Sequence, residues 1–360
     1  MQTGGASGYA AIHSRVRVMY SALLGPQELA DLANAPDLSG LVGLLKDTPY
    51  GSYLEGLEDK ELTPKQFIYQ VQKRLSDAYI TLVHSAPAHT RPLLTELFRH
   101  FEIDNLKTVL RAIVIHSTWE QVKEILFPLG SLAKLPVEKM MEVGTVEAAI
   151  AQLAGTPYYD TLSHALKRYI EEQSLFPLEV ALDLDYWRTL WLNTNRLPGQ
   201  DRTQALRIVG PWVDMNNLMW AMRYRVYHHL SEEEIINYTL PFGYRIRDED
   251  IRAIAAGADI TRIVMRLYPG SRNVDELLQD PEHGLPKLEL QLQRYIVQKL
   301  NAVFTGYPFH IGLPLAFLVL NELELQDLTV LIEAKASGKT PADFLPYLLM
   351  RTNVEEFATS

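Results

Sequence analysis

A short acidic pattern occurs three times in this chain of 360 residues. In each copy an acidic residue is followed three positions later by asparagine or aspartate, and a leucine comes directly after it. The copies lie at 101–106, 213–218 and 323–328. Asn217 lies 112 positions after Asn105, and Asp327 lies 110 positions after Asn217. A nearly constant period indicates a fold in which one structural repeat is used three times.

A second pattern supports this period. Thr48-Pro49-Tyr50 is repeated as Thr156-Pro157-Tyr158, 108 positions later, and the third copy keeps only Leu267-Tyr268-Pro269. Two short stretches with apolar residues at helical spacing precede each of these patterns. They are 27–32 and 38–45, then 137–141 and 146–153, then 250–255 and 260–267. Each repeat is therefore predicted to begin with a pair of short helices.

A long helix is predicted after each of these patterns. In the first repeat, apolar residues recur every three or four positions, at Phe67, Ile68, Val71, Leu75, Ala78, Tyr79 and Leu82. Thr63 can cap the start of this helix, Pro64 suits its first turn, and Gln66 completes a capping box. A further helix then carries the acidic pattern, and alternation typical of strands is limited to 244–246. The predicted fold class is therefore all-α.

The three repeats are predicted to span residues 1–120, 121–238 and 239–360. No long linker rich in glycine or serine separates them. Helical repeats that each leave an apolar face open bury those faces against one another. We therefore expect three quasi-equivalent helical repeats that either stack or are arranged around a pseudo-threefold axis as one rigid body.

Composition excludes several classes of function. The formal net charge of −10 disfavours nucleic acids and anionic lipid headgroups as partners, because lysine and arginine supply most of the affinity for both. The absence of cysteine excludes disulfides, thiol nucleophiles and cysteine-ligated metals. The longest uncharged apolar run, 311–320, is about half of the roughly 20 residues of a membrane-spanning helix, and Pro314 interrupts it. With no secretory signal at its start, the chain is expected to remain cytoplasmic, without direct lipid insertion.

The acidic pattern supplies the candidate functional residues. They are Glu102, Asn105, Asp214, Asn217, Glu324 and Asp327, and the two residues of each copy share one helical face. Such a pair could bind a metal or act in acid–base catalysis, but three similar copies point more simply to a structural role. We expect these side chains to form polar bonds to a turn of the neighbouring long helix and to fix how two helices dock. No catalytic residue, cofactor site or metal site is predicted.

Two other motifs suggest ligand sites and fail on inspection. Gly338-Lys339-Thr340 resembles the end of a phosphate-binding loop, but Glu333 stands where the first glycine is required, and a helix precedes the motif. The glycine is better explained as the terminator of that helix. His228 and His229 are adjacent and would point about 100° apart on a helix, so they cannot share a metal ion.

Asp183 and Asp185, with Asn193 and Asn195 downstream, suggest the metal-binding carboxylates of helical enzymes that process diphosphates. Their spacing differs from that pattern. They lie in a stretch that is longer than its counterpart in the first repeat, so we expect a surface insertion or an extended helix end. A metal-dependent helical enzyme is an alternative that would require tight divalent-metal binding lost on Asp183→Ala.

Several segments together resemble the C subunit of the archaeal and bacterial V/A-type rotary ATPase, which is called the d subunit in eukaryotic V-ATPases. The resemblance spans nearly the whole chain and rests on the order of the motifs, their triplication and the chain length. The segments are Gly8-Tyr9, Arg15-Val16-Arg17, Thr48-Pro49-Tyr50, Glu102 to Leu106, Leu240-Pro241-Phe242-Gly243-Tyr244 and Phe309 to Leu328.

This resemblance implies a fold and a function. The fold is a funnel of three helical repeats that sits on the membrane proteolipid ring and receives the central-shaft subunits. The function is transmission of torque during transport of protons or sodium ions, linked to ATP synthesis or hydrolysis, at the cytoplasmic face of the membrane and without any cofactor. Asn321 and Thr329 stand where relatives often have basic residues, which bears on the contacts with shaft and ring. A stand-alone helical scaffold or adaptor protein is the alternative.

Overall fold

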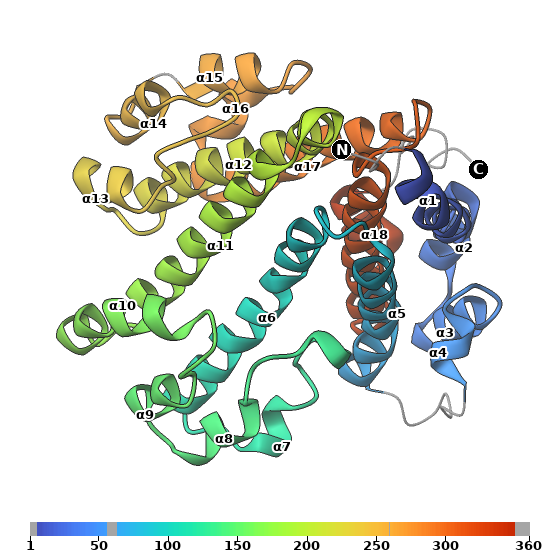
Figure 1. The fold of residues 1–360 in the computed structure, drawn as a ribbon, viewed down its shortest axis with the longest axis horizontal. Helices are drawn as coiled ribbons and strands as arrows, with labels where there is room; N and C mark the ends of the chain where they lie inside the picture. The colour runs from blue at the N-terminus through green and yellow to red at the C-terminus, as the bar shows by residue number, and fades with distance from the viewer. Residues whose placement is uncertain (1–5, 56–62, 259, 350–360) are drawn as a thin grey trace. The chain divides into compact units, whose positions relative to one another are not determined.

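Helices account for all regular structure in the residues that the computed structural model describes, 6–55, 63–258 and 260–349 (Figure 1). The all-α prediction is therefore confirmed for these residues. The helices of the first half are α1 (Ala6–Ser21), α2 (Pro26–Asn34), α3 (Leu38–Lys46), α4 (Gly51–Leu54), α5 (Pro64–Ser85), α6 (Arg91–Val114), α7 (Trp119–Val122), the 3₁₀ helix η1 (Gly130–Leu132), α8 (Val137–Glu142), α9 (Val146–Ala151) and α10 (Tyr159–Glu172). Those of the second half are α11 (Phe176–Arg196), α12 (Gly199–Val226), α13 (Glu232–Asn237), α14 (Asp248–Ala255), α15 (Ile260–Leu267), α16 (Val274–Gln279), α17 (Pro281–Val303), α18 (Gly312–Ala336), α19 (Pro341–Phe344) and the 3₁₀ helix η2 (Leu345–Tyr347).

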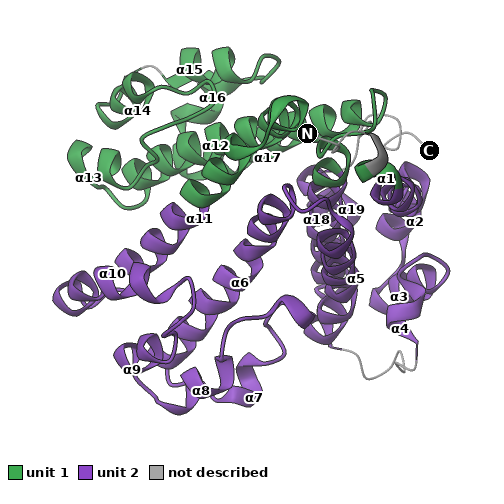
Figure 2. Cartoon of the chain, in the orientation of Figure 1, with its two compact units in different colours: residues 1–10, 187–316 green, residues 11–186, 317–360 purple. Residues whose placement is uncertain are grey.

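The chain divides into two compact units (Figure 2). Unit 1 comprises residues 1–10 and 187–316, and unit 2 comprises residues 11–186 and 317–360. The predicted limits of the three repeats, near residues 120 and 238, fall inside these units. The division into three repeats therefore stays a prediction.

The start and the buried face of α5 follow from its sequence. The Thr63 hydroxyl accepts the Gln66 N–H at 3.3 Å, and the Gln66 side chain accepts the Thr63 N–H at 3.2 Å. Pro64 occupies the first turn, where no N–H is needed. The residues of the predicted apolar stripe are buried except Ile68, which is half-buried. This stripe is the face by which α5 joins the core of unit 2.

Unit 1 is built around α12 and α17, which pack along each other. Gly210 lies in α12 where the ring of Tyr244 rests on the helix, and a Cβ atom at this position would come within 2.4 Å of that ring. A side chain at position 210 would therefore push the loop after α13 away from α12.

The helix α18 supplies much of the core of unit 2. Its residues from 317 to 325 are all buried, which is the behaviour of a helix inside a core. The apolar run at 311–320, predicted to be too short for a membrane span, reaches into this helix. Among the described residues, no helix combines the length and the apolarity that crossing a membrane requires.

Three smaller predictions have clear outcomes. The segment 244–246 forms bends and no strand. The helix α18 ends at Ala336, and Gly338 has a φ of 63°, so this glycine lies at the end of a helix as expected. The stretch in which an insertion or an extended helix end is predicted forms a separate helix, α11.

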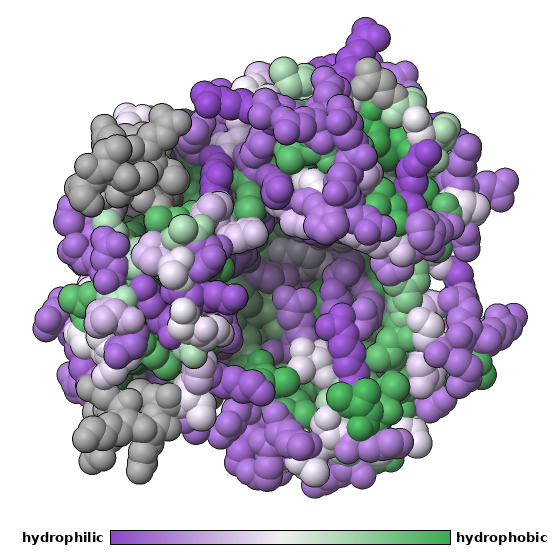
Figure 3. Space-filling model, turned by 180° about the vertical axis from the view of Figure 1, so that it is seen from behind, coloured by the Kyte–Doolittle hydropathy of each residue, from purple (hydrophilic) through white to green (hydrophobic). Residues whose placement is uncertain are grey.

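Hydrophilic residues dominate the face that Figure 3 shows, and hydrophobic residues gather in smaller patches between them. The exposed apolar side chains of the described residues include Ile115 (72% exposed) and Val18 (69%). Single exposed apolar residues are ordinary on folded proteins.

Candidate functional site

The three copies of the acidic motif lie on three long helices. Glu102 and Asn105 belong to α6, Asp214 and Asn217 to α12, and Glu324 and Asp327 to α18. All six residues are buried, with exposed fractions between 0% and 4%. Burying a polar group is costly unless hydrogen bonds replace those it makes to water. The partners of these side chains therefore define the site.

In the first copy, both side chains bind the backbone of the chain that follows α6. The Glu102 carboxylate accepts the N–H groups of Lys134 and of the next residue, and it accepts the Tyr158 hydroxyl. Asn105 pairs with Phe127 as one peptide group pairs with another, because its Oδ1 accepts the Phe127 N–H and its Nδ2 donates to the Phe127 carbonyl, both at 2.8 Å. The pair fixes the segment between α6 and α8 against α6.

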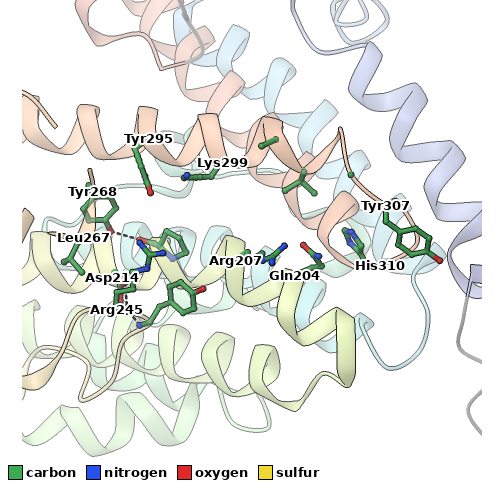
Figure 4. A pocket seen from close by; sticks show the side chains of 15 residues that line it. Gln204, Arg207, Asp214, Arg245, Leu267, Tyr268, Tyr295, Lys299, Tyr307 and His310 are labelled. Carbon is green, nitrogen blue, oxygen red and sulfur yellow. Dashed lines mark hydrogen bonds between the residues drawn. The ribbon is translucent and has the colours of Figure 1, made fainter. Parts of the chain in front are cut away.

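The second copy repeats this arrangement in unit 1. Asp214 accepts the Tyr244 N–H at 2.7 Å and the N–H groups of the next two residues at 2.8 and 3.3 Å (Figure 4). Asn217 accepts the Leu240 N–H at 2.7 Å and donates to the carbonyls of Leu240 and Phe242 at 3.1 and 3.0 Å. The loop between α13 and α14 is thus held against α12.

In the third copy, Asp327 binds a partner as far along the chain as the partners of Asn105 and Asn217 are. Asp327 accepts the Leu349 N–H at 2.6 Å, 22 positions downstream. The corresponding partners in the first two copies lie 22 and 23 positions downstream. An aspartate keeps the acceptor half of this pairing, whereas the asparagines of the other copies also donate.

The acidic residue of the third copy, Glu324, binds residues in the first part of the chain. The Glu324 carboxylate accepts the Leu24 N–H at 2.5 Å, the Tyr50 hydroxyl at 2.7 Å and the Arg74 guanidinium at 3.1 Å. Leu24 lies 300 positions before Glu324. This contact therefore joins α18 to the connection between α1 and α2.

The N–H groups that these three acidic residues bind follow the repeat period. Leu24, Lys134 and Tyr244 are spaced 110 positions apart, and they bind Glu324, Glu102 and Asp214 respectively. Glu102 and Asp214 thus bind segments 32 and 30 positions downstream, whereas Glu324 binds a segment 300 positions upstream that occupies the same place in the predicted period. The predicted partner is a turn of the neighbouring long helix. In the structure the backbone N–H groups come from loops, and one side chain of a long helix, Arg74 of α5, also donates to Glu324.

The tyrosine of the second repeated pattern also docks on a motif helix. Tyr50, Tyr158 and Tyr268 have exposed fractions of 0% to 1%. The first two donate to Glu324 and Glu102 as described, and the Tyr268 hydroxyl donates to the Pro211 carbonyl of α12 at 2.7 Å. Burial raises the pKa of all three phenols, so they remain protonated donors.

The negative charge of the acidic residue is compensated differently in the second and third copies. Burial raises the pKa of Glu324 from its ordinary value, and the Arg74 guanidinium opposes that rise. Burial also raises the pKa of Asp214, where backbone N–H groups oppose it. The third copy thus contains a buried ion pair at a position where the second copy uses backbone dipoles.

Arg74 is a site residue that the sequence analysis did not single out. It lies on the buried face of α5, and its guanidinium also donates to Asn321 Oδ1 at 3.2 Å and to the Ala22 carbonyl at 2.7 Å. In the sequence, Arg74 falls at helical spacing between Val71 and Ala78 of the apolar stripe. A charged residue inside such a stripe is the signal that points to it.

A second ion pair joins α6 to α18 in unit 2. His100 Nε2 lies 3.1 Å from Glu322 Oε1, next to a cavity of about 420 Å³. Burial lowers the pKa of His100, but the Glu322 carboxylate, with further help from Asp104 and the Leu97 carbonyl, raises it to about 9. Positions 100 and 322 each stand two residues before the acidic residue of their copy, but nothing in the sequence indicates that α6 and α18 pack together there.

Asp183 and Asp185 are bound by cations of α6. The Lys107 ammonium binds Asp183, and the Arg99 guanidinium donates to Asp185 at 2.6 Å. Within the described part of the chain, no three histidine or acidic residues are grouped so that they could hold a metal ion. These carboxylates dock α11 on α6, and the alternative of a metal-dependent enzyme gains no support from them.

A family model described as ATP synthase (C/AC39) subunit matches residues 12–343. The C subunit of the A-type ATP synthase of Methanocaldococcus jannaschii is 26% identical over 346 residues, which cover 95% of this chain and 86% of that protein. The C subunits of the A-type ATP synthases of Methanosphaera stadtmanae and Thermococcus onnurineus are each 24% identical, over 95% and 92% of this chain and 88% of their own lengths.

Proposed function

Because this chain belongs to the ATP synthase (C/AC39) subunit family, we propose that it is the rotor subunit that couples the central shaft of a V/A-type rotary ATPase to the membrane proteolipid ring. In this role it carries torque while ions cross the membrane, and the chemistry of ATP takes place on other subunits. The observation that supports this role most is the docking contact that recurs in all three copies of the acidic motif.

The architecture we assign to this role is a funnel of three repeats, 1–120, 121–238 and 239–360, around a pseudo-threefold axis. It is supported by the direction of the contacts, since each motif binds the opening of the next repeat and Glu324 binds the opening of the first at Leu24. This order of contacts is the one that three repeats around a pseudo-threefold axis would make.

A part that transmits torque has to resist deformation. Close-packed interiors have low compressibility and transmit strain. In this chain, each of the buried motifs fixes a loop to a helix by several hydrogen bonds, and a displaced loop would leave buried polar atoms without partners. The motif therefore serves as a structural joint between successive repeats.

The residues that depart from the family pattern have partners inside the chain. Asn321 is buried and accepts a hydrogen bond from Arg74. Thr329 is half-buried, and its hydroxyl donates to the Leu325 carbonyl at 2.8 Å. We therefore place the contacts with shaft and proteolipid ring on other residues, and the chain at the cytoplasmic face of the membrane through its protein partners.

Purification of the intact complex through a tag on this chain tests the proposed function. After gentle solubilisation of membranes, we expect the shaft subunits and the proteolipid to co-purify. Complexes depleted of the chain should hydrolyse ATP without transporting ions, and adding the chain back should restore transport. Recovery of the chain without any proteolipid would favour a scaffold or adaptor, and ATP hydrolysis by the purified chain alone would contradict the coupling role.

A further inference from the structure

A cavity of about 520 Å³ lies in unit 1 between α12, α17 and the loop that Asp214 holds (Figure 4). Small-molecule sites are typically clefts of roughly 300 to 1,000 Å³. The cavity is therefore large enough for a ligand of nucleotide size, and the docking role of the motif does not use it.

Cations from three separate segments line this cavity. Arg207 comes from α12, Arg245 from the loop before α14, and Lys299 from α17. All three residues are exposed, and within the described residues neither Arg207 nor Lys299 forms an ion pair with a carboxylate. In Figure 4 the three side chains are spread along the gap between the two helices, with Lys299 between the other two. In a chain with a net charge of −10, such a grouping of cations is a marked local excess.

Aromatic side chains form much of the remaining wall. Tyr268 and Tyr295 pack edge to face with their ring centres 5.5 Å apart, and the Lys299 ammonium lies 5.0 Å from the centre of the Tyr295 ring. Tyr244 and Tyr307 also line the cavity and are 38% and 54% exposed. The wall thus offers phenol rings and hydroxyl groups beside the cations.

Asp214 is the one carboxylate among the residues that line the cavity. Its oxygens accept three backbone N–H groups, which compensate its charge before any ligand arrives. His310 completes the polar wall, and burial lowers its pKa, so this ring is neutral at pH 7. The balance of charge facing the cavity is therefore positive.

We propose that this cavity binds a phosphorylated small anion with more than one phosphate group. Arginine and lysine are the side chains that recognise phosphate, and cations spread along a cleft suit several anionic groups in a row. A ring carried by the ligand packs on the exposed tyrosines. An acidic peptide is a poorer match, because a single carboxylate engages one cation and a peptide would have to enter a cleft of small-molecule size. The proposal does not rest on the coupling function, since it concerns binding by the isolated chain.

Titration calorimetry on the full chain tests the proposal, with inorganic tripolyphosphate, ADP and a glutamate-rich peptide as probes. Phosphatidylcholine vesicles that contain phosphatidic acid provide a lipid-borne phosphate. The cavity variant is Arg207→Gln with Lys299→Gln. The control variant, Arg262→Gln with Lys287→Gln, removes the same charge from exposed positions of unit 1 outside the cavity. Circular dichroism verifies that both variants fold.

We expect tripolyphosphate or ADP to bind the parent chain, and the cavity variant to bind at least about tenfold more weakly while the control changes by less than about twofold. Vesicle binding that depends on Arg207 and Lys299, without binding of the soluble probes, would contradict the proposal, because it would assign the cations to the single phosphate of a lipid headgroup. The proposal is overturned if no phosphate probe binds, if both variants lose binding equally, or if the peptide binds more tightly than the phosphates.

Discussion

The second and third copies of the acidic motif carry out one task with different chemistry. In unit 1, Asp214 holds the loop at Tyr244 through backbone N–H groups, 30 to 32 positions downstream. In unit 2, Glu324 holds the segment at Leu24, 300 positions upstream, and adds a buried ion pair with Arg74. The backbone contact is common to both, and the ion pair belongs to the copy whose partner is distant in sequence.

The difference follows from the cost of bringing two segments together. The entropy lost on closing a loop grows slowly with its length, by about 0.6 kcal/mol for each doubling, so the longer connection costs roughly 2 kcal/mol more. A short connection leaves the loop near its helix, and backbone N–H groups are enough. The distant segment has one contact more, the ion pair with Arg74; the Tyr50 hydroxyl is not peculiar to it, because Tyr158 binds Glu102 in the same way across a short connection.

The largest effect is expected from Glu324→Gln. The substitution keeps the size of the side chain but leaves the buried Arg74 guanidinium without its anion, which costs about 3 to 5 kcal/mol of unfolding free energy. No cation is paired with Asp214, so Asp214→Asn should cost only about 1 to 3 kcal/mol of unfolding free energy. Urea denaturation followed by circular dichroism measures both. Arg74→Met should recover part of the stability that Glu324→Gln loses. Equal losses in Glu324→Gln and Asp214→Asn would contradict the idea that the buried ion pair makes the third copy more sensitive.

The pH dependence of stability gives the next largest effect. The pKa of His100 is raised to about 9 in the folded chain, above its ordinary value of 6.5. Its contribution is therefore fully present below pH 6.5 and is lost as the pH rises through about 9, an effect of roughly 3 kcal/mol. We expect the unfolding free energy to fall over this range, and to fall less in His100→Gln. A parallel pH profile in the variant would show that the pair with Glu322 does not stabilise unit 2.

Asn217→Leu and Asn105→Leu should each cost about 2 kcal/mol. Both substitutions leave the buried N–H and carbonyl groups of a loop without partners. Asn216→Leu is the matched control, since Asn216 is half-buried and only donates to the Trp212 carbonyl of its own helix. Differential scanning calorimetry should show a lower melting temperature for the two motif variants and little change for the control. Unchanged melting in both motif variants would mean that the asparagines do not hold the loops.

The smallest effect is expected for an exposed ion pair in unit 1. Arg223 and Glu289 join α12 to α17, but their side chains are 37% and 25% exposed. Solvent screens such a pair, so Arg223→Gln should cost less than about 1 kcal/mol, and added salt should reduce the difference further. A cost as large as that of Glu324→Gln would show that burial does not set the strength of these pairs.

The sequence predicts the features that side chains encode directly. The all-α class and the start of α5 at Pro64, capped by Thr63, can be predicted because each depends on residue identities at fixed spacing. The partners of the motif were not, because Glu102, Asp214 and Glu324 bind backbone N–H groups. A backbone N–H is the same in every residue except proline, so the partner segments share a position in the repeat without sharing a residue type.

The ion pairs and the cavity were hidden for a different reason. Arg74 and Glu324 are 250 positions apart, and the cations of the cavity come from three separate elements. No local pattern relates such residues, so only the packing of the helices brings them together. The apolar stripe of α5 marks Arg74 as unusual without naming its partner.

Hydrogen exchange at the Leu24 amide of the intact chain tests most directly whether Glu324 ties the end of the chain to its beginning. If it does, this amide exchanges as slowly as the core amides of α18, and Glu324→Gln speeds its exchange by orders of magnitude more than it speeds exchange at Tyr244. A Leu24 amide that exchanges at the rate of an unprotected peptide in the parent chain would contradict the docking of this segment on α18.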